Sequence, residues 1–314
     1  MILQAGVFDS IPIANVSVLQ GRIRMRVAIT GASGLIGTEL MRSMAGTDLI
    51  PIGLSRKENK GAQFVKCDYS RESLTSVFST ADAVVQLAAV RGGEGKSYKE
   101  YQENEELMET VLYAMQDTGI ERLIYMSSIS VYSDTMLIPW NERHALNPTT
   151  LYGISKLKGE YLCNLFEKRG IRPCIFRCAH VLGLEEKGYM LSKFLNGAYN
   201  GEELTVKGKS IAKREFIYIK DVCDAIIWAL QNDNVQGTYN LGSGVGYTNL
   251  EIAQYINTVF ENKTGIRYES QSDEGIQSSI MDVTKIRNAG FKLQYNILSA
   301  VEDIRKEKFI KLRQ

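Results

Sequence analysis

The sequence has little of what several classes of protein require. Its 314 residues contain five cysteines, an odd number with no Cys-x-x-Cys pair, and only two histidines. A dedicated zinc site is therefore not expected, and the cysteines are predicted to be buried free thiols of a reducing compartment. The formal net charge is +1, without a block of like charges, which disfavours binding of nucleic acid through a general basic field.

Long apolar runs are also missing. No stretch approaches the ~20 apolar residues that cross a bilayer, and the first twenty residues contain Asp9, Pro12 and Asn15 and lack a basic start. We therefore predict neither a membrane span nor a signal peptide, and we expect a cytoplasmic protein.

Strand-like and helix-like patterns alternate from Met25 onward. Because strands that alternate with helices form parallel sheets, we predict an α/β fold built on a doubly wound parallel sheet of the Rossmann type. The predicted strands of this part are 27–30, 49–54, 63–67, 83–88, 120–127 and 172–176, and the predicted helices are 35–44, 70–78, 101–117 and one within 148–170.

The alternation weakens after Gly183, where strands are predicted at 216–219 and 238–241 and helices at 222–230, 249–260 and 299–306. We expect residues 25–182 to form a dinucleotide-binding domain, to which 213–244 return. A smaller, mostly C-terminal substrate-binding domain is expected from 183–212 and 245–314. Residues 1–24 precede a methionine at which the fold could start, and we predict a poorly ordered extension or a misassigned start.

A glycine-rich loop, Gly31-x-x-Gly34-x-x-Gly37, follows the first predicted strand and opens the first predicted helix. Glycines allow a tight turn and a close approach of the backbone to phosphate. The N-terminus of the helix then offers N–H groups and a partial positive charge to an anion. This context favours a dinucleotide pyrophosphate site over a simple turn.

The residues after the second predicted strand indicate which dinucleotide is bound. A carboxylate there would hold a free ribose 2′-hydroxyl, but the segment reads Ser55-Arg56-Lys57. The two basic side chains are suited to a 2′-phosphate. The cofactor is therefore predicted to be NAD(P), with NADP favoured over NAD, unless these are merely solvated loop charges.

Tyr152 and Lys156 lie four residues apart in a predicted helix and so share a face. A nearby ammonium lowers the pKa of a phenol, which lets a tyrosine exchange protons with a hydroxyl or a carbonyl. Ser128 ends the strand predicted at 120–127, at the sheet edge where ligands bind. These residues form a candidate catalytic set, although a surface pair and a capping serine would look the same.

Together these residues resemble the extended short-chain dehydrogenase/reductase family, in its NAD(P)-dependent nucleotide-sugar epimerase/dehydratase branch. The resemblance covers about residues 25–300 and includes the run Ser127-Ser128-Ile129-Ser130-Val131-Tyr132 and the segment Arg214–Val222. It implies catalysis by Ser128, Tyr152 and Lys156. It implies cofactor binding by Gly31, Ser33, Gly34, Leu35, Ile36, Gly37, Arg56, Asp68, Tyr69, Leu87, Ala88, Ala89, Asn104, Tyr152 and Lys156.

For the substrate, the resemblance implies a nucleotide-diphosphate sugar contacted by Ser128, His180 and Arg214, with Arg214 on the diphosphate. Relatives that carry out 4,6-dehydration place an acidic pair after the catalytic serine, where this chain has Ile129 and Ser130. Dehydration is therefore disfavoured. His180 stands where many relatives have asparagine, so it is either an unusual sugar contact or a packing residue.

We accordingly predict an epimerase that transfers a hydride through the Ser-Tyr-Lys set. Two alternatives remain, an NADPH-dependent reductase of a nucleotide-linked keto-sugar or other carbonyl, and a non-catalytic protein that senses a dinucleotide. The resemblance further implies a homodimer, formed through two helices of the first domain.

Overall fold

The computed structural model describes residues 24–57, 61, 63–92, 95–183, 190–269, 271 and 277–311. The prediction made for residues 1–24 lies outside this part, apart from Arg24. Among the described residues, none of the helices combines the length and the apolar character needed to cross a membrane. All five cysteines are buried and unpaired, as the sequence predicts.

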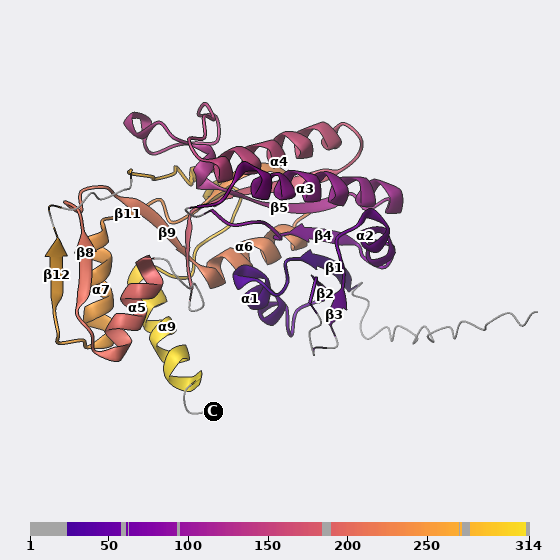
Figure 1. The fold of residues 1–314 in the computed structure, drawn as a ribbon. Helices are drawn as coiled ribbons and strands as arrows, with labels where there is room; N and C mark the ends of the chain where they lie inside the picture. Colours follow the sequence, from indigo (N-terminus) through magenta and orange to yellow (C-terminus); the bar gives the residue numbers. More distant parts are fainter. Residues whose placement is uncertain are drawn as a thin grey trace, which may run out of the picture.

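A seven-stranded parallel sheet forms the centre of the fold (Figure 1). Its order is β10-β6-β5-β4-β1-β2-β3, so the chain starts in the interior of the sheet and winds outward in both directions. This arrangement confirms the predicted doubly wound Rossmann fold. The strands are β1 (Met25–Thr30), β2 (Leu49–Ser55), β3 (Phe64–Lys66), β4 (Ala83–Gln86), β5 (Arg122–Ser128), β6 (Arg172–Cys178) and β10 (Gly237–Leu241).

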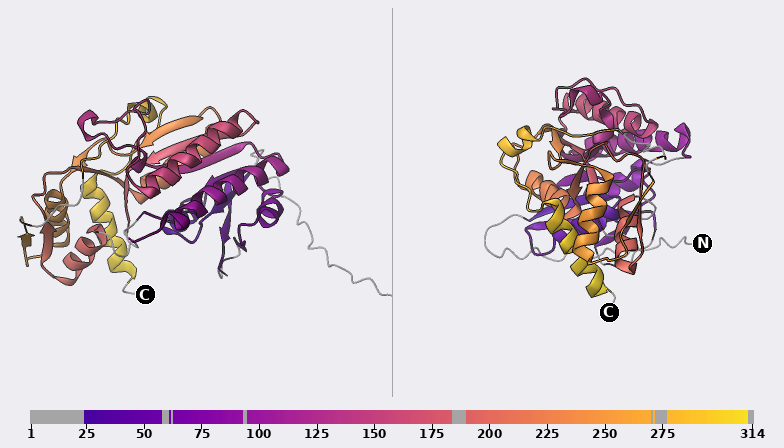
Figure 2. Two further views of the ribbon diagram at one scale, coloured as in Figure 1. Left: turned by 45° about the horizontal axis from the view of Figure 1, so that its top comes forward. Right: turned by 90° about the vertical axis from the view of Figure 1, so that its left-hand side faces the viewer.

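Helices cover both faces of this sheet. On one face α1 (Leu35–Ser43) packs beside α6 (Ile219–Gln231). On the other, α3 (Tyr98–Thr118) lies between α2 (Arg71–Phe78) and α4 (Leu151–Glu167), and α3 and α4 run side by side (Figure 2). Strands such as β4 are buried along their whole length, because each face of the sheet meets an apolar helical layer.

Two smaller sheets follow the end of β6. One joins β7 (His180–Leu182), β9 (Arg214–Tyr218) and β11 (Gly246–Tyr247), and the other pairs β8 (Leu204–Lys207) with β12 (Ile266–Glu269). The 3₁₀ turns are η1 (Ile129–Val131) and η2 (Thr135–Leu137). The remaining helices are α5 (Met190–Asn200), α7 (Asn249–Phe260), α8 (Thr284–Asn288) and α9 (Ile297–Lys311).

Local signals explain where the elements begin and end. Thr150 caps α4 by accepting a hydrogen bond from Gly153 N, and Gly119 ends α3 in the left-handed conformation. Helix α3 nevertheless begins three residues before the predicted start, because Ser97 and Glu100 form a capping box. Helix α5 and strands β7, β8, β11 and β12 were not predicted.

Helix α4 approaches strand β5 so closely that two positions have no room for a side chain. A Cβ atom at Gly153 would lie 2.2 Å from the backbone oxygen of Ser130, and one at Gly159 would lie 2.2 Å from the Tyr125 hydroxyl. Tyr125 in turn donates a hydrogen bond to the carbonyl of Lys156. These contacts therefore fix both the distance of α4 from β5 and the rotation of the helix about its own axis.

Gly153→Ala should push α4 away from η1, because the clash is with backbone and cannot be relieved by a side-chain rotation. We expect a loss of about 1–3 kcal/mol in the free energy of unfolding, measured by urea denaturation. Asn164→Ala, at an exposed position of the same helix, is the control and should leave stability within ~0.5 kcal/mol. Equal stability of both variants would contradict this account.

Candidate cofactor and substrate site

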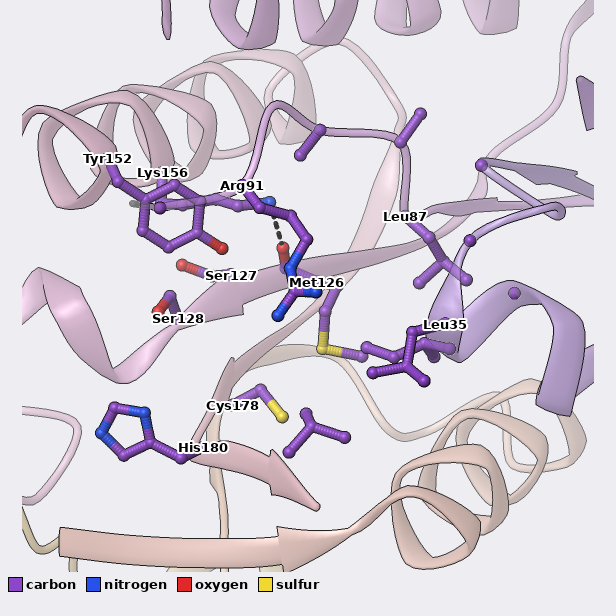
Figure 3. Close-up of a pocket in the computed structure, with 18 of the residues that line it drawn as sticks. Leu35, Leu87, Arg91, Met126, Ser127, Ser128, Tyr152, Lys156, Cys178 and His180 are labelled. Atoms are coloured by element: carbon purple, nitrogen blue, oxygen red, sulfur yellow. Dashed lines mark hydrogen bonds between the residues drawn. The ribbon is translucent and has the colours of Figure 1, made fainter. Parts of the chain in front are cut away.

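A cavity of about 760 Å³ opens at the carboxyl ends of β1, β4, β5 and β6. The structure brings most of the residues singled out in the sequence to its wall (Figure 3). These lining residues are Gly31, Ser33, Gly34, Leu35, Ile36, Gly37, Arg56, Tyr69, Leu87, Ala88, Ala89, Ser128, Tyr152, Lys156, His180 and Arg214.

The glycine loop is shaped for a ligand that needs the backbone itself. Gly31 has φ +66°, and a Cβ there would lie 2.7 Å from Ala88 N. At Gly37 a Cβ would lie 2.3 Å from the carbonyl oxygen of Gly31. Helix α1 starts after Gly34 with no side-chain cap, so its first N–H groups are available to an anion. The loop therefore fits a dinucleotide pyrophosphate.

The hydroxyl of Thr30 connects the glycine loop to the next strand of the sheet. It accepts hydrogen bonds from Leu87 N at 3.1 Å and Ala88 N at 3.2 Å, and it also bonds the side chain of Gln86. On the other side, the Tyr69 hydroxyl accepts from Gly31 N at 3.0 Å and donates to the carbonyl of Leu54. The floor of the cofactor site is thus held by hydrogen bonds between neighbouring strands.

Lys156 is buried beneath the catalytic end of the cavity, with an exposed fraction of 4%. Its Nζ donates to the carbonyl of Met126 at 2.8 Å and lies 5.8 Å from the ring centre of Tyr152. Burial lowers its pKa to about 8, while Cys178 and Glu160 act in the opposite direction. The ammonium therefore persists at neutral pH and lies beside the phenol.

Ser128 faces the same space as Tyr152 (Figure 3). Its Oγ accepts a hydrogen bond from Ser130 N at 3.1 Å and donates to Ser130 Oγ at 3.2 Å. The backbone of Gly92 packs on the other side of the Tyr152 ring, where a Cβ would lie 3.3 Å from ring carbons. Strand β5 and helix α4 thus bring the hydroxyls of Ser128 and Tyr152 and the ammonium of Lys156 to the lining of the same cavity.

His180 and Arg214 lie on the neighbouring strands β7 and β9. The His180 ring packs against Phe216 at 5.8 Å, and burial, followed by the charge of Arg214, lowers the pKa of His180 to about 4. A neutral imidazole therefore faces the cavity. Arg214 Nη2 donates to Asn249 Oδ1 at 2.9 Å and contacts Met190 Sδ, which holds the guanidinium at the cavity wall.

Two predicted cofactor residues do not line this cavity. Asp68 accepts from Ser70 N at the start of α2. Asn104 lies within α3 rather than at its beginning, and its amide bonds both backbone groups of Val90 and the hydroxyl of Ser155. In this structure Asn104 holds the loop after β4 against α4.

Other lining residues escaped the sequence reasoning, above all Arg91. Arg91 follows Ala89 by two residues, so a basic side chain just after a buried strand was the available signal. Among the described lining residues the charged groups are Arg56, Lys57, Arg91, Lys156 and Arg214, and none is a carboxylate. Such a wall attracts a ligand that carries several phosphates.

The parallel sheet, the glycine loop and the residues at the carboxyl edge define the dinucleotide-binding fold of the extended short-chain dehydrogenases/reductases. A model of the NAD dependent epimerase/dehydratase family matches residues 27–242. The chain therefore belongs to the NAD dependent epimerase/dehydratase family.

Solved structures and curated relatives agree with this assignment. The crystal structure of UDP-N-acetylglucosamine 4-epimerase from Bacillus cereus is 38% identical with a TM-score of 0.83, covering 89% of this chain and 98% of that chain. UDP-glucose 4-epimerase of Lactobacillus helveticus is 27% identical, over 73% of this chain and 80% of its own length.

A third protein resembles this chain in fold alone. It is the UDP-glucuronic acid 4-epimerase from Bacillus cereus, solved in complex with UDP-glucuronic acid and NAD. It is 21% identical with a TM-score of 0.79, and the match covers 90% of this chain and 99% of that one.

Proposed function

We propose that this protein is an NAD(P)-dependent epimerase of a nucleotide-diphosphate sugar. The observation that carries the proposal is the convergence of Ser128, Tyr152 and Lys156 at one end of a cavity whose glycine loop fits a pyrophosphate. Relatives that include a UDP-N-acetylglucosamine 4-epimerase at 38% identity support the choice of substrate class.

In the proposed reaction Tyr152 removes the proton from a sugar hydroxyl and later returns it. The buried Lys156 ammonium favours the phenolate form of Tyr152, because opposite charge at short range lowers the pKa of a phenol. Ser128 orients the reacting oxygen by a hydrogen bond. A dinucleotide held by the glycine loop and Lys156 would supply the hydride acceptor, and afterwards the hydride donor, for the sugar carbon that changes configuration.

The substrate end of the site is proposed to use Arg214 and His180. Described residues of the segments 183–212 and 245–314, such as Met190 and Asn249, are proposed to form most of its wall. Arg214 would bind the diphosphate, and His180 would serve as a neutral hydrogen-bonding group beside it. A second cavity of about 650 Å³ shares Met190 and Arg214 with the first and offers room for the nucleoside. Arg91 would neutralise a further phosphate charge between the two ligands.

Tyr152→Phe should reduce turnover of UDP-N-acetylglucosamine or UDP-glucose at least ~100-fold with cofactor affinity retained, because only the proton-exchanging hydroxyl is lost. Tyr101→Phe, whose ring lies 6.2 Å from that of Tyr152 but outside the cavity lining, is the control. Undiminished activity of Tyr152→Phe would contradict the proposal. Net oxidation of added NADPH, one per product, would indicate the reductase instead.

We further propose NADP as the preferred dinucleotide. The end of β2 presents Ser55, Arg56 and Lys57 to the cavity, and the Ser55 hydroxyl lies 3.4 Å from that of Ser33. Hydroxyls and two cations are a suitable set for a 2′-phosphate, whereas a 2′-hydroxyl is usually held by a carboxylate. The UDP-glucuronic acid 4-epimerase described above was solved with NAD, so the preference for NADP has to be measured on this chain itself.

Arg56→Ala should weaken NADP binding about 10- to 100-fold, since a hydrogen bond to a charged group contributes roughly 1.5–3 kcal/mol, and should change NAD binding little. Isothermal titration with both dinucleotides measures the difference, with Lys66→Ala as a control outside the cavity. Mass spectrometry that finds only NAD bound to the purified protein would reject the NADP preference.

We also propose a homodimer formed through α3 and α4. Tyr161 and Leu165 lie one turn apart on α4 and are 61% and 48% exposed, which gives an apolar stripe beside α3. Burying this stripe against a second copy would be favourable. Light scattering should therefore give twice the mass of one chain, and Leu165→Glu should halve it. A monomeric wild-type protein would refute this proposal.

A further inference from the structure

A buried ion pair lies directly behind the catalytic residues. Glu160 on α4 and Arg177 on β6 are 2% and 5% exposed. Arg177 Nη2 donates to Glu160 Oε2 at 2.7 Å and Arg177 Nε donates to Oε1 at 3.1 Å. The two side chains thus form a bidentate pair in the core, and neither side chain lines the cavity.

The pair is tied to the end of β5 that carries Ser128. The neighbouring Ser127 donates a hydrogen bond from its Oγ to Glu160 Oε1 at 2.5 Å. Ser127 therefore cannot shift along the strand direction without losing a charge-assisted bond, which is about twice as strong as a neutral one. Since Ser128 is bonded to Ser127 through the backbone, its position is set by the same contact.

Glu160 also follows Lys156 by one helical turn, on the same face of α4. Burial lowers the pKa of Lys156 to about 8, and Cys178 on β6, followed by Glu160, acts in the opposite direction. The ring of Tyr125 on β5 also faces Lys156 Nζ, at 5.3 Å from the ring centre. The remaining donors of Arg177 are satisfied by the Tyr132 hydroxyl at 2.8 Å and the Glu142 carbonyl at 3.1 Å. Tyr132 then donates to Asn240 on β10.

Stability alone does not account for this arrangement. Replacing a buried ion pair by apolar residues of similar volume is often neutral or stabilising in proteins, so a core of this kind could be apolar. The pair instead joins α4 and β6 to Ser127 on β5 and to Tyr132, which directly follows η1.

We infer that Glu160, held in place by Arg177, is a positioning residue of the reaction, fixing Ser128 through Ser127 and keeping Lys156 charged beside Tyr152. This inference rests on the proposed function. Glu160 touches no reacting atom in this scheme and acts only through Ser127 and Lys156.

The first test is Glu160→Gln, assayed for turnover of a UDP-sugar that the wild type accepts. We expect kcat to fall at least about tenfold, with KM and cofactor affinity within about twofold, because the groups that bind ligands remain. The alkaline limb of the kcat–pH profile should move to lower pH. The sign follows from Lys156, whose pKa of about 8 falls further without the carboxylate, so that its ammonium is lost at lower pH.

Two companion variants separate positioning from folding. Ser127→Ala keeps the ion pair and removes only its bond to β5, so kcat should fall while the alkaline limb stays in place. The double variant Glu160→Gln with Arg177→Met removes both charges and avoids a buried unpaired guanidinium. Its alkaline limb should move less than in the single variant, because loss of the Arg177 charge opposes the effect that loss of the Glu160 charge has on Lys156. Asp303→Asn is the matched control, because it breaks an ion pair with Lys220 remote from the cavity.

The inference is overturned if folded Glu160→Gln keeps the wild-type alkaline limb, or if Ser127→Ala or the double variant keeps the wild-type kcat. A shift of the limb in Asp303→Asn would overturn it as well, since the shift would then report stability alone. These results are distinguishable from failure of the proposed function, which would appear as undiminished activity of Tyr152→Phe.

Discussion

The close packing of α4 on β5 is the constraint on which the candidate site depends. With glycine at positions 153 and 159, the helix lies close enough for Lys156 Nζ to reach the carbonyl of Met126. A helix lifted by the thickness of a side chain would withdraw both Lys156 and Tyr152 from the hydroxyl of Ser128. The geometry of the candidate catalytic set is therefore determined by the close approach of the α4 backbone to β5.

Charged side chains lie on both sides of the contact between α4 and β5, some on the cavity wall and others in the core. The cavity wall carries five basic side chains and, among its described residues, no carboxylate, which suits two ligands that each bear a diphosphate. Glu160, one helical turn after Lys156, is turned into the core and paired with Arg177. The carboxylate therefore lies outside the lining of this cavity, while its charge still acts on Lys156 from behind.

Prediction from sequence was accurate for buried strands and for helices whose ends carry local capping signals. The parallel sheet followed from alternating patterns, and the bounds of α7 were predicted to the residue because Thr248 and Glu251 form a capping box. The prediction from sequence failed for short strands that pair with segments far away in the chain. An example is β8 with β12, whose paired residues lie about sixty positions apart.

The sequence by itself determined the glycine loop, the Tyr152–Lys156 spacing and the family, because these depend on residue type at short separation. Only the tertiary structure decided which residues share the cavity. Arg91, in the loop after β4, lines the cavity, whereas Asn104 lies outside its lining and bonds Ser155 on α4. The burial of Lys156 and its balance by Glu160 and Arg177 likewise join α4 to β6 across the fold. Such contacts depend on how the helices lie on the sheet, which no local pattern specifies.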